Sequence, residues 1–117
     1  MIRHDNENGS VNISTSVYTD IVGTAATNCM GVKGMAASSV KDGVYHLLRK
    51  ESVGKGVRVE FHENNEISID LHIMVGDGVN LTAIGNAIID EVRYMVEKCT
   101  GTKVRAVNVY IDSMMIG

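Results

Sequence analysis

Apolar and polar residues alternate most regularly between residues 57 and 75. Val57, Val59 and Phe61 alternate with polar residues, and after a short break the same pattern continues from Ile67 to Val75. A period of two predicts two β-strands, each with one buried face. The apolar faces meet only if the connecting loop has an odd number of residues, which excludes a two-residue turn. Loops of three and of five residues both meet this condition, but a three-residue loop would set Glu60 opposite Asp70. We therefore predict a five-residue loop, His62–Glu66, that pairs Phe61 with Ile67 and Arg58 with Asp70.

Two segments have the spacing of amphipathic helices. The first begins after Ser14, ends before Gly31, and has an apolar side formed by Val17, Ile21, Val22, Ala25, Ala26 and Cys29. The second begins after Asn80 or Thr82, ends at Thr100-Gly101, and has an apolar side formed by Ile84, Ile88, Val92, Met95, Val96 and Cys99. Polar caps at the start and glycine after the end are typical helix boundaries. Such stripes predict helices that need a sheet to cover them.

The order of these elements predicts an α+β domain, a mixed sheet with two helices on one face, in the order β-α-β-β-β-α-β. The remaining strands are expected at Ser10–Ile13, Val32–Ala37 and Val104–Ile111, the last with Val107, Val109 and Ile111 on one side. Residues 1–8 are polar and are expected to be disordered, and residues 9–117 form a single domain. Residues 38–55 are expected to form either a short helix or a mobile excursion.

Composition and charge limit the class of protein and the cellular compartment that the sequence fits. The chain has 117 residues and a net charge of −3, and no apolar run approaches the roughly 18 residues of a membrane span. Its polar first residues do not form a signal peptide, so a cytoplasmic protein is expected. In that compartment Cys29 and Cys99 are interpreted as two small buried hydrophobic residues. The segment Lys41–Arg58 has a local charge of +3, because it contains five basic residues and only two acidic ones, Asp42 and Glu51.

No group of residues forms a recognisable active site. Gly31-Val32-Lys33-Gly34 has the spacing of a nucleic-acid-binding GxxG loop, but strand residues follow it. Gly76-Asp77-Gly78 lacks the spacing of a phosphate-binding loop. The four histidines lack metal-ligand spacing; they are His4, His46, His62 and His72. We predict no catalytic, cofactor-binding or metal-binding residues, and no cofactor.

One polar surface stays open to two interpretations. The outward residues of the predicted hairpin could form an acid and base cluster, or they could be solvated cross-strand pairs, which is the simpler interpretation. They are Arg58, Glu60, Asp70 and His72.

The motifs and their order resemble the alkaline-shock, or envelope stress-response, protein family of Gram-positive bacteria. The motifs that carry the resemblance are Gly9-Ser-Val-Asn-Ile-Ser14, Met30-Gly31-Val32, Lys55-Gly56-Val57-Arg58-Val59, Ile69-Asp70-Leu71-His72-Ile73, Gly78-Val79-Asn80, Glu91-Val92, Thr100-Gly101 and Val107-Asn108-Val109. The chain departs from the family pattern at Asp77, where an aromatic residue is expected, and at Thr82, where proline is common. The resemblance implies a non-enzymatic cytosolic protein linked to cell-envelope homeostasis, which in some relatives is held beneath the membrane by a separate partner.

Three function hypotheses follow. The first is a protein-interaction module that self-associates or binds an envelope-linked protein partner. The second is a module that binds nucleic acid or anionic lipid through the basic segment 41–58, in which case binding would weaken steeply with salt. The third is a small enzyme or an accessory subunit of one, and it rests only on the polar hairpin face. We favour the first.

Overall fold

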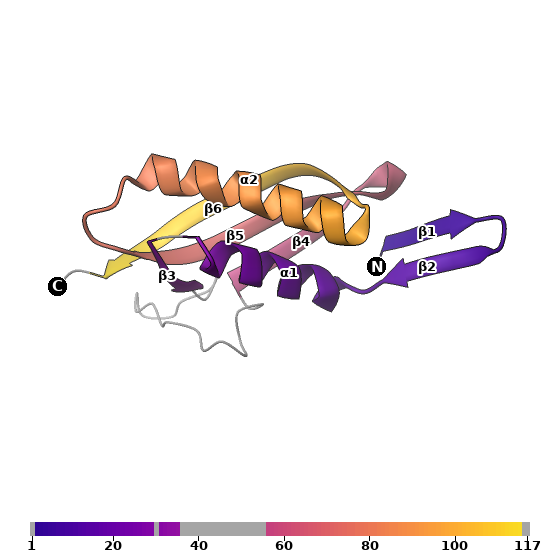
Figure 1. The fold of residues 1–117 in the computed structure, drawn as a ribbon, viewed down its shortest axis with the longest axis horizontal. Helices are drawn as coiled ribbons and strands as arrows, with labels where there is room; N and C mark the ends of the chain where they lie inside the picture. The colour runs from indigo at the N-terminus through magenta and orange to yellow at the C-terminus, as the bar shows by residue number, and fades with distance from the viewer. Residues whose placement is uncertain (1, 30, 36–55, 116–117) are drawn as a thin grey trace.

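The computed structural model describes residues 2–29, 31–35 and 56–115, and it confirms an α+β domain. In chain order its elements are β1 (Ile2–Asn6), β2 (Gly9–Ile13), α1 (Thr15–Thr27), β3 (Val32–Met35), β4 (Val57–Phe61), a 3₁₀ turn (Glu63–Asn65), β5 (Glu66–Gly76), α2 (Leu81–Thr100) and β6 (Lys103–Met115). The two helices lie together on one face of the main sheet, and the β1–β2 hairpin extends away from it (Figure 1).

Strand β5 is the centre of the main sheet. Along one edge it pairs antiparallel with β4 over its first half and with β3 near its end, and along the other edge it pairs parallel with β6. Helix α2 makes the crossover that parallel neighbours require. Every second residue of β5 is fully buried beneath the helices; these residues are Ile67, Ile69, Leu71, Ile73 and Val75.

The predicted hairpin register is confirmed. Phe61 lies opposite Ile67, Val59 opposite Ile69, and Arg58 opposite Asp70. The intervening loop closes with a hydrogen bond of 2.8 Å from the His62 backbone N–H to the Glu66 carbonyl. Requiring apolar faces to meet limited the loop to an odd number of residues, and setting Asp70 opposite Arg58 and not opposite Glu60 then selected this pairing.

Strand β6 contains two irregularities that the sequence pattern did not predict. Its register against β5 shifts between Val104 and Ala106 and again between Ile111 and Ser113, so Arg105 and Asp112 are extra residues without a partner in β5. A bulge of this kind shifts the alternation of faces by one residue. As a result Val104 and Val107 are both buried although an odd number of residue steps separates them.

Both helices begin where predicted. Asn80 caps α2, because its side-chain oxygen accepts a hydrogen bond of 3.0 Å from the Ala83 backbone N–H, and Gly101 ends the helix in the left-handed conformation with φ of 73°. Ser14 is the N-cap residue of α1, but its side chain bonds to the Ser16 hydroxyl instead of a backbone N–H. Helix α1 also ends earlier than predicted, at Thr27.

The buried side of α1 is centred on Tyr18, which the sequence analysis did not identify. Tyr18 is fully buried, whereas Val17, predicted to face the core, is 41% exposed. Cys99 is also exposed, so the interpretation of both cysteines as buried residues was wrong for Cys99. Helical periodicity defines a stripe, but at its margin it does not decide which of two neighbouring residues faces inward.

The N-terminus differs from the expectation of disorder, because residues 2–6 form strand β1. This strand pairs with β2 in a separate two-stranded sheet, with Ile2 opposite Ile13 and Asn6 opposite Gly9. Ile2 is buried in the core, and His4 Nε2 lies 3.1 Å from the Thr102 hydroxyl. These two contacts hold an otherwise polar strand that has no clear alternation.

A buried polar group joins the hairpin, α1 and the start of β6. Thr102 is fully buried just before β6, and its hydroxyl lies 2.7 Å from the Tyr18 hydroxyl as well as close to His4. A buried hydroxyl needs such partners because an unmade hydrogen bond is costly. No buried side-chain nitrogen or oxygen in the described part of the chain lacks a hydrogen-bond partner.

Candidate functional site

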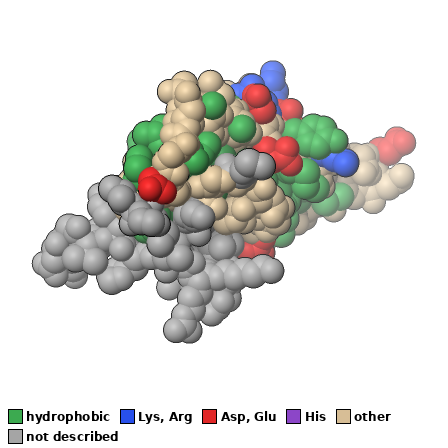
Figure 2. Space-filling model, turned by 60° about the vertical axis from the view of Figure 1, so that its left-hand side comes forward, with side chains coloured by type: hydrophobic (Ala, Val, Ile, Leu, Met, Phe, Trp, Pro, Cys, Tyr) green, Lys and Arg blue, Asp and Glu red, His purple; other side chains and the backbone are tan. Residues whose placement is uncertain are grey.

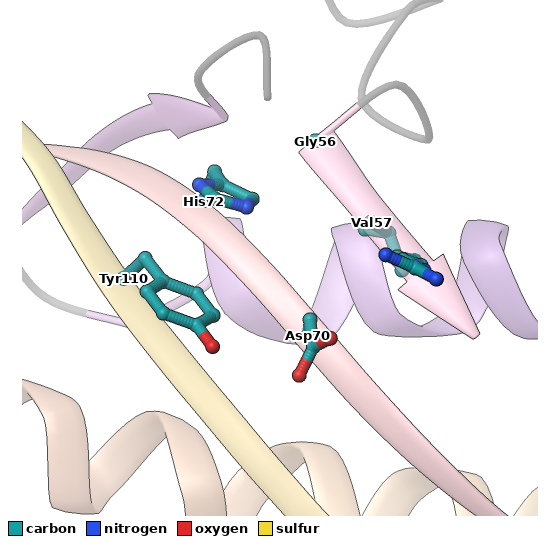
Figure 3. A pocket seen from close by; sticks show the side chains of 6 residues that line it. Gly56, Val57, Asp70, His72 and Tyr110 are labelled. Atoms are coloured by element: carbon teal, nitrogen blue, oxygen red, sulfur yellow. The ribbon is translucent and has the colours of Figure 1, made fainter. Parts of the chain in front are cut away.

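The face of the main sheet opposite the helices is lined by polar side chains of β4, β5 and β6. On β5 the residues between the buried ones point to this side, so Ser68, Asp70 and His72 follow from the same alternation that builds the core. In Figure 3, which looks onto this face, the helices lie behind the sheet. The polar residues are therefore placed by a strand whose other face is fixed in the core.

His72 is held on this face by contacts with two side chains of β6. Its Nδ1 donates a hydrogen bond of 2.7 Å to Asp112 Oδ2, and its ring stacks on that of Tyr110 with centroids 4.8 Å apart and an angle of 13° between the planes. Tyr110 lies directly opposite His72 in β6. Asp112 is the extra residue of the second β6 bulge, and that bulge allows it to reach His72.

Among the described residues, Asp70 is held from one side only. Its Oδ1 accepts a hydrogen bond of 2.9 Å from the Asn108 side-chain amide, which leaves the second carboxylate oxygen free of that contact. Arg58 lies directly opposite Asp70 in β4, yet the two side chains do not come within the 4.0 Å of an ion pair. The Arg58 guanidinium and the Asp70 carboxylate thus lie on neighbouring strands without forming an ion pair with each other.

These side chains surround a pocket of about 370 Å³. It is lined by Gly56, Val57, Arg58, Asp70, His72 and Tyr110, so it spans β4, β5 and β6 (Figure 3). The size is within the usual range for small-molecule sites, about 300 to 1,000 Å³. The polar face is therefore hollowed at this point and not flat.

The sequence analysis identified part of this site. Arg58, Asp70 and His72 line the pocket as members of the predicted polar face, whereas Glu60 belongs to the same face but not to the pocket. It missed Tyr110 and Asp112, which come from β6. Their distance along the chain from β5 hides the contact, and only the parallel register brings them together.

A second polar cluster lies at the other end of the β5–β6 pair. Glu66 contacts Arg105 at 3.0 Å and Lys103 at 3.7 Å. The hydrogen bond from Arg105, together with the charges of both basic residues, lowers the pKa of the Glu66 carboxyl. The three side chains are exposed enough to be read as a surface ion-pair network.

The chain matches one protein-family model over almost its whole length. The model of the alkaline-shock protein 23 family, described as having a cell envelope-related function, matches residues 3–116. The chain belongs to this family. The resemblance to the alkaline-shock and envelope stress-response proteins is thereby confirmed.

Curated relatives of this alkaline-shock-family chain come from Bacillus and Streptococcus. It is 34% identical to the uncharacterised protein YloU of Bacillus subtilis over 109 residues, which is 92% of this chain and 90% of YloU. It is 32% identical to the uncharacterised protein Spy1614 of Streptococcus pyogenes over 116 residues, 98% of this chain and 95% of that protein. The relatives share the length of the chain, but their names assign no molecular activity.

The fold also resembles a solved structure. The structure titled MamM-CTD H285A has a TM-score of 0.50 against this alkaline-shock-family chain, at 14% identity, and the match covers 86% of this chain and 98% of the other. At that identity the likeness concerns the fold alone.

The other histidines and the two cysteines of this alkaline-shock-family protein do not lie in the pocket where the structure describes them. His62 contacts the Ser68 hydroxyl at 2.7 Å and His4 contacts Thr102, while His46 lies outside the described residues. Within residues 2–29, 31–35 and 56–115, no three His, Cys, Asp or Glu side chains come together as metal ligands would. Cys29 and Cys99 are free thiols, and burial, helped by the charge of Glu91, raises the pKa of Cys29.

The structure describes one of the two sequence features considered for nucleic-acid binding, the GxxG motif, and only a small part of the other, the basic segment 41–58. The GxxG motif does not form a loop between helices, because its last three residues, Val32–Gly34, belong to β3. Most of the basic segment 41–58 lies outside the described residues, and only residues 56–58 can be placed. In the view of Figure 2 the described acidic, basic and hydrophobic side chains are interspersed.

Neither described helix has the length and apolar character needed to cross a membrane.

Proposed function

We propose that this alkaline-shock-family protein is a non-enzymatic scaffold of cell-envelope homeostasis that acts from the cytoplasm by associating with other protein chains, first of all with copies of itself. The family description supports the link to the cell envelope. The finer claim, assembly through protein contacts, is supported by one structural feature, the outer edge of β6.

Strand β6 has 13 residues and pairs only with β5 among the described elements. A strand edge of this kind carries backbone N–H and C=O groups that can accept a strand from another chain. Charged residues protect its beginning, where Lys103 and Arg105 lie, but near its end the apolar side chain of Met114 is 41% exposed.

The test is sedimentation velocity of the full chain over a range of concentrations. We expect concentration-dependent association, and we expect Met114→Lys to weaken it at least tenfold, because lysine on an edge strand opposes pairing. Val11→Lys is the matched control, since Val11 is a similarly exposed apolar residue in the β1–β2 hairpin. A chain that stays monomeric at millimolar concentration, or that loses association equally in both variants, would refute assembly through this edge.

Membrane-linked partners are the second part of this proposal. Affinity capture from the native cytosol and from detergent-solubilised membranes should recover the same partner with the parent chain and lose it with Met114→Lys. The alternative of binding nucleic acid or anionic lipid rests on residues 41–58 and stays a prediction, because no described residue adds to it.

A further inference from the structure

The pocket on the polar sheet face has features that suit a small ligand carrying two opposite charges. We propose that it binds a zwitterion of the α-amino acid class, with Arg58 taking the carboxylate, Asp70 taking the ammonium group, and the Tyr110–His72 ring stack bordering the ligand's side chain. This site is separate from the β6 edge, and it goes beyond the scaffold function.

The first observation is the unpaired arrangement of Arg58 and Asp70. They face each other across the β4–β5 ladder without forming an ion pair with each other. Because a guanidinium binds a carboxylate through two parallel N–H groups, Arg58 is suited to the acid end of the ligand. The Asp70 oxygen that Asn108 does not contact can accept from an ammonium group.

The second observation is the balance of charge in the pocket. Among the described residues of its lining there are one guanidinium and one carboxylate, and the other ionisable side chains there, His72 and Tyr110, belong to the stacked pair. A purely anionic ligand would meet repulsion from Asp70, and a purely cationic ligand would meet repulsion from Arg58. A ligand that carries both charges a few ångströms apart satisfies both groups.

The third observation is the rigidity of the aromatic wall. The Asp112 carboxylate holds His72 through Nδ1, and Tyr110 stacks on the same ring. Both rings stand on paired strands whose opposite face is packed in the core. A preorganised wall reduces the entropy lost on binding, and a planar side chain of the ligand can stack against the exposed Tyr110 ring.

The probe is L-phenylalanine, and its two charge-deleted analogues are phenethylamine, without the carboxylate, and 3-phenylpropionate, without the ammonium group. Titration is followed by amide chemical shifts of the ¹⁵N-labelled full chain, with calorimetry for affinity. We expect L-phenylalanine to shift the amides of Gly56 and Val57 and to bind at least tenfold more tightly than either analogue.

Two variants separate the charges, and both residues are on the accessible polar face. Arg58→Gln should abolish the preference for L-phenylalanine over phenethylamine, while Asp70→Asn should abolish its preference over 3-phenylpropionate. Glu60→Gln is the control, because Glu60 is an exposed residue of the same sheet face outside the pocket. It should leave both preferences unchanged.

Several outcomes would overturn the proposal. They are the absence of pocket shifts at 10 mM L-phenylalanine, equal binding of the amino acid and one analogue, and preferences that survive both pocket substitutions. A panel of amino acids with small, branched and charged side chains extends the test to the class. Because the readout is binding on the polar sheet face, its result does not depend on whether the chain assembles through the outer edge of β6.

Discussion

Removing the Thr102 hydroxyl tests whether the buried contact between α1 and the start of β6 is a real determinant of stability. Thr102→Val keeps the shape of the side chain but leaves the Tyr18 hydroxyl, which is fully buried, without the partner that lies 2.7 Å away. A buried hydroxyl without a partner costs about 1 to 3 kcal/mol. We therefore expect the free energy of unfolding to fall by that amount.

A double-mutant cycle separates this explanation from a general loss of packing. Tyr18→Phe alone should cost less, about 0.5 to 1.5 kcal/mol, because Thr102 keeps its contact with His4. Combining the two substitutions removes both hydroxyl groups, so neither is left without its partner. The loss in the double variant should therefore be smaller than the sum of the two single losses, by an interaction energy of about 0.5 to 3 kcal/mol.

The assay is urea denaturation of the four proteins, followed by circular dichroism, with equal m-values as the criterion that the unfolded states are comparable. Thermal unfolding gives an independent reading, since 1 kcal/mol corresponds to roughly 3 to 6 °C for a chain of this size. Additive losses, or a Thr102→Val variant as stable as the parent chain, would contradict this explanation.

Three further substitutions test other parts of the structure. Gly31→Ala should destabilise by about 1 to 3 kcal/mol in urea denaturation, because φ is +93° there and a new Cβ would lie 2.6 Å from Ile84 Cδ1. Asn80→Ala should cost about 0.5 to 2 kcal/mol in the same assay through loss of the α2 cap; no change would exclude the capping bond. Arg105→Gln should raise the pKa of Glu66 toward its ordinary value of 4.5, measured by NMR titration. A carboxyl whose pKa is lower in the folded than in the unfolded protein stabilises the fold at pH values above its unfolded pKa, and this stabilisation is lost as the pH falls through its folded pKa. The variant should therefore be less stable than the parent chain at neutral pH but not in strong acid.

The fold was predictable where neighbouring residues interact and harder to predict where distant strands meet. The β4–β5 register followed from two requirements, that the apolar sides of the two strands face each other and that Asp70 lies opposite Arg58. Strand β1 was not predicted because a single buried side chain, Ile2, and one contact with Thr102 anchor it. Both contacts are with parts of the chain that no local pattern connects to residues 2–6.

The candidate site also depends on contacts between distant strands, which local sequence patterns do not predict. Arg58, Asp70 and His72 were identified because alternation puts them on the outward side of their strands. Tyr110 and Asp112 were not, because their place depends on the parallel register of β6 and on its second bulge. A bulge adds a residue without changing the hydrophobic pattern enough to be recognised. Sequence periodicity therefore found the half of the pocket formed by β4 and β5 and missed the half formed by β6.

The two proposals depend on different properties of β6, and this allows each to fail alone. Association through its outer edge uses backbone groups and Met114, whereas the pocket uses only the Tyr110 ring, held against His72 by the β5–β6 pairing. Tyr110→Leu should therefore weaken L-phenylalanine binding while the edge remains available, and Met114→Lys should do the reverse. If instead both substitutions impaired both properties, the strand would be responding as one unit, and neither the pocket nor the edge could be assigned a separate role.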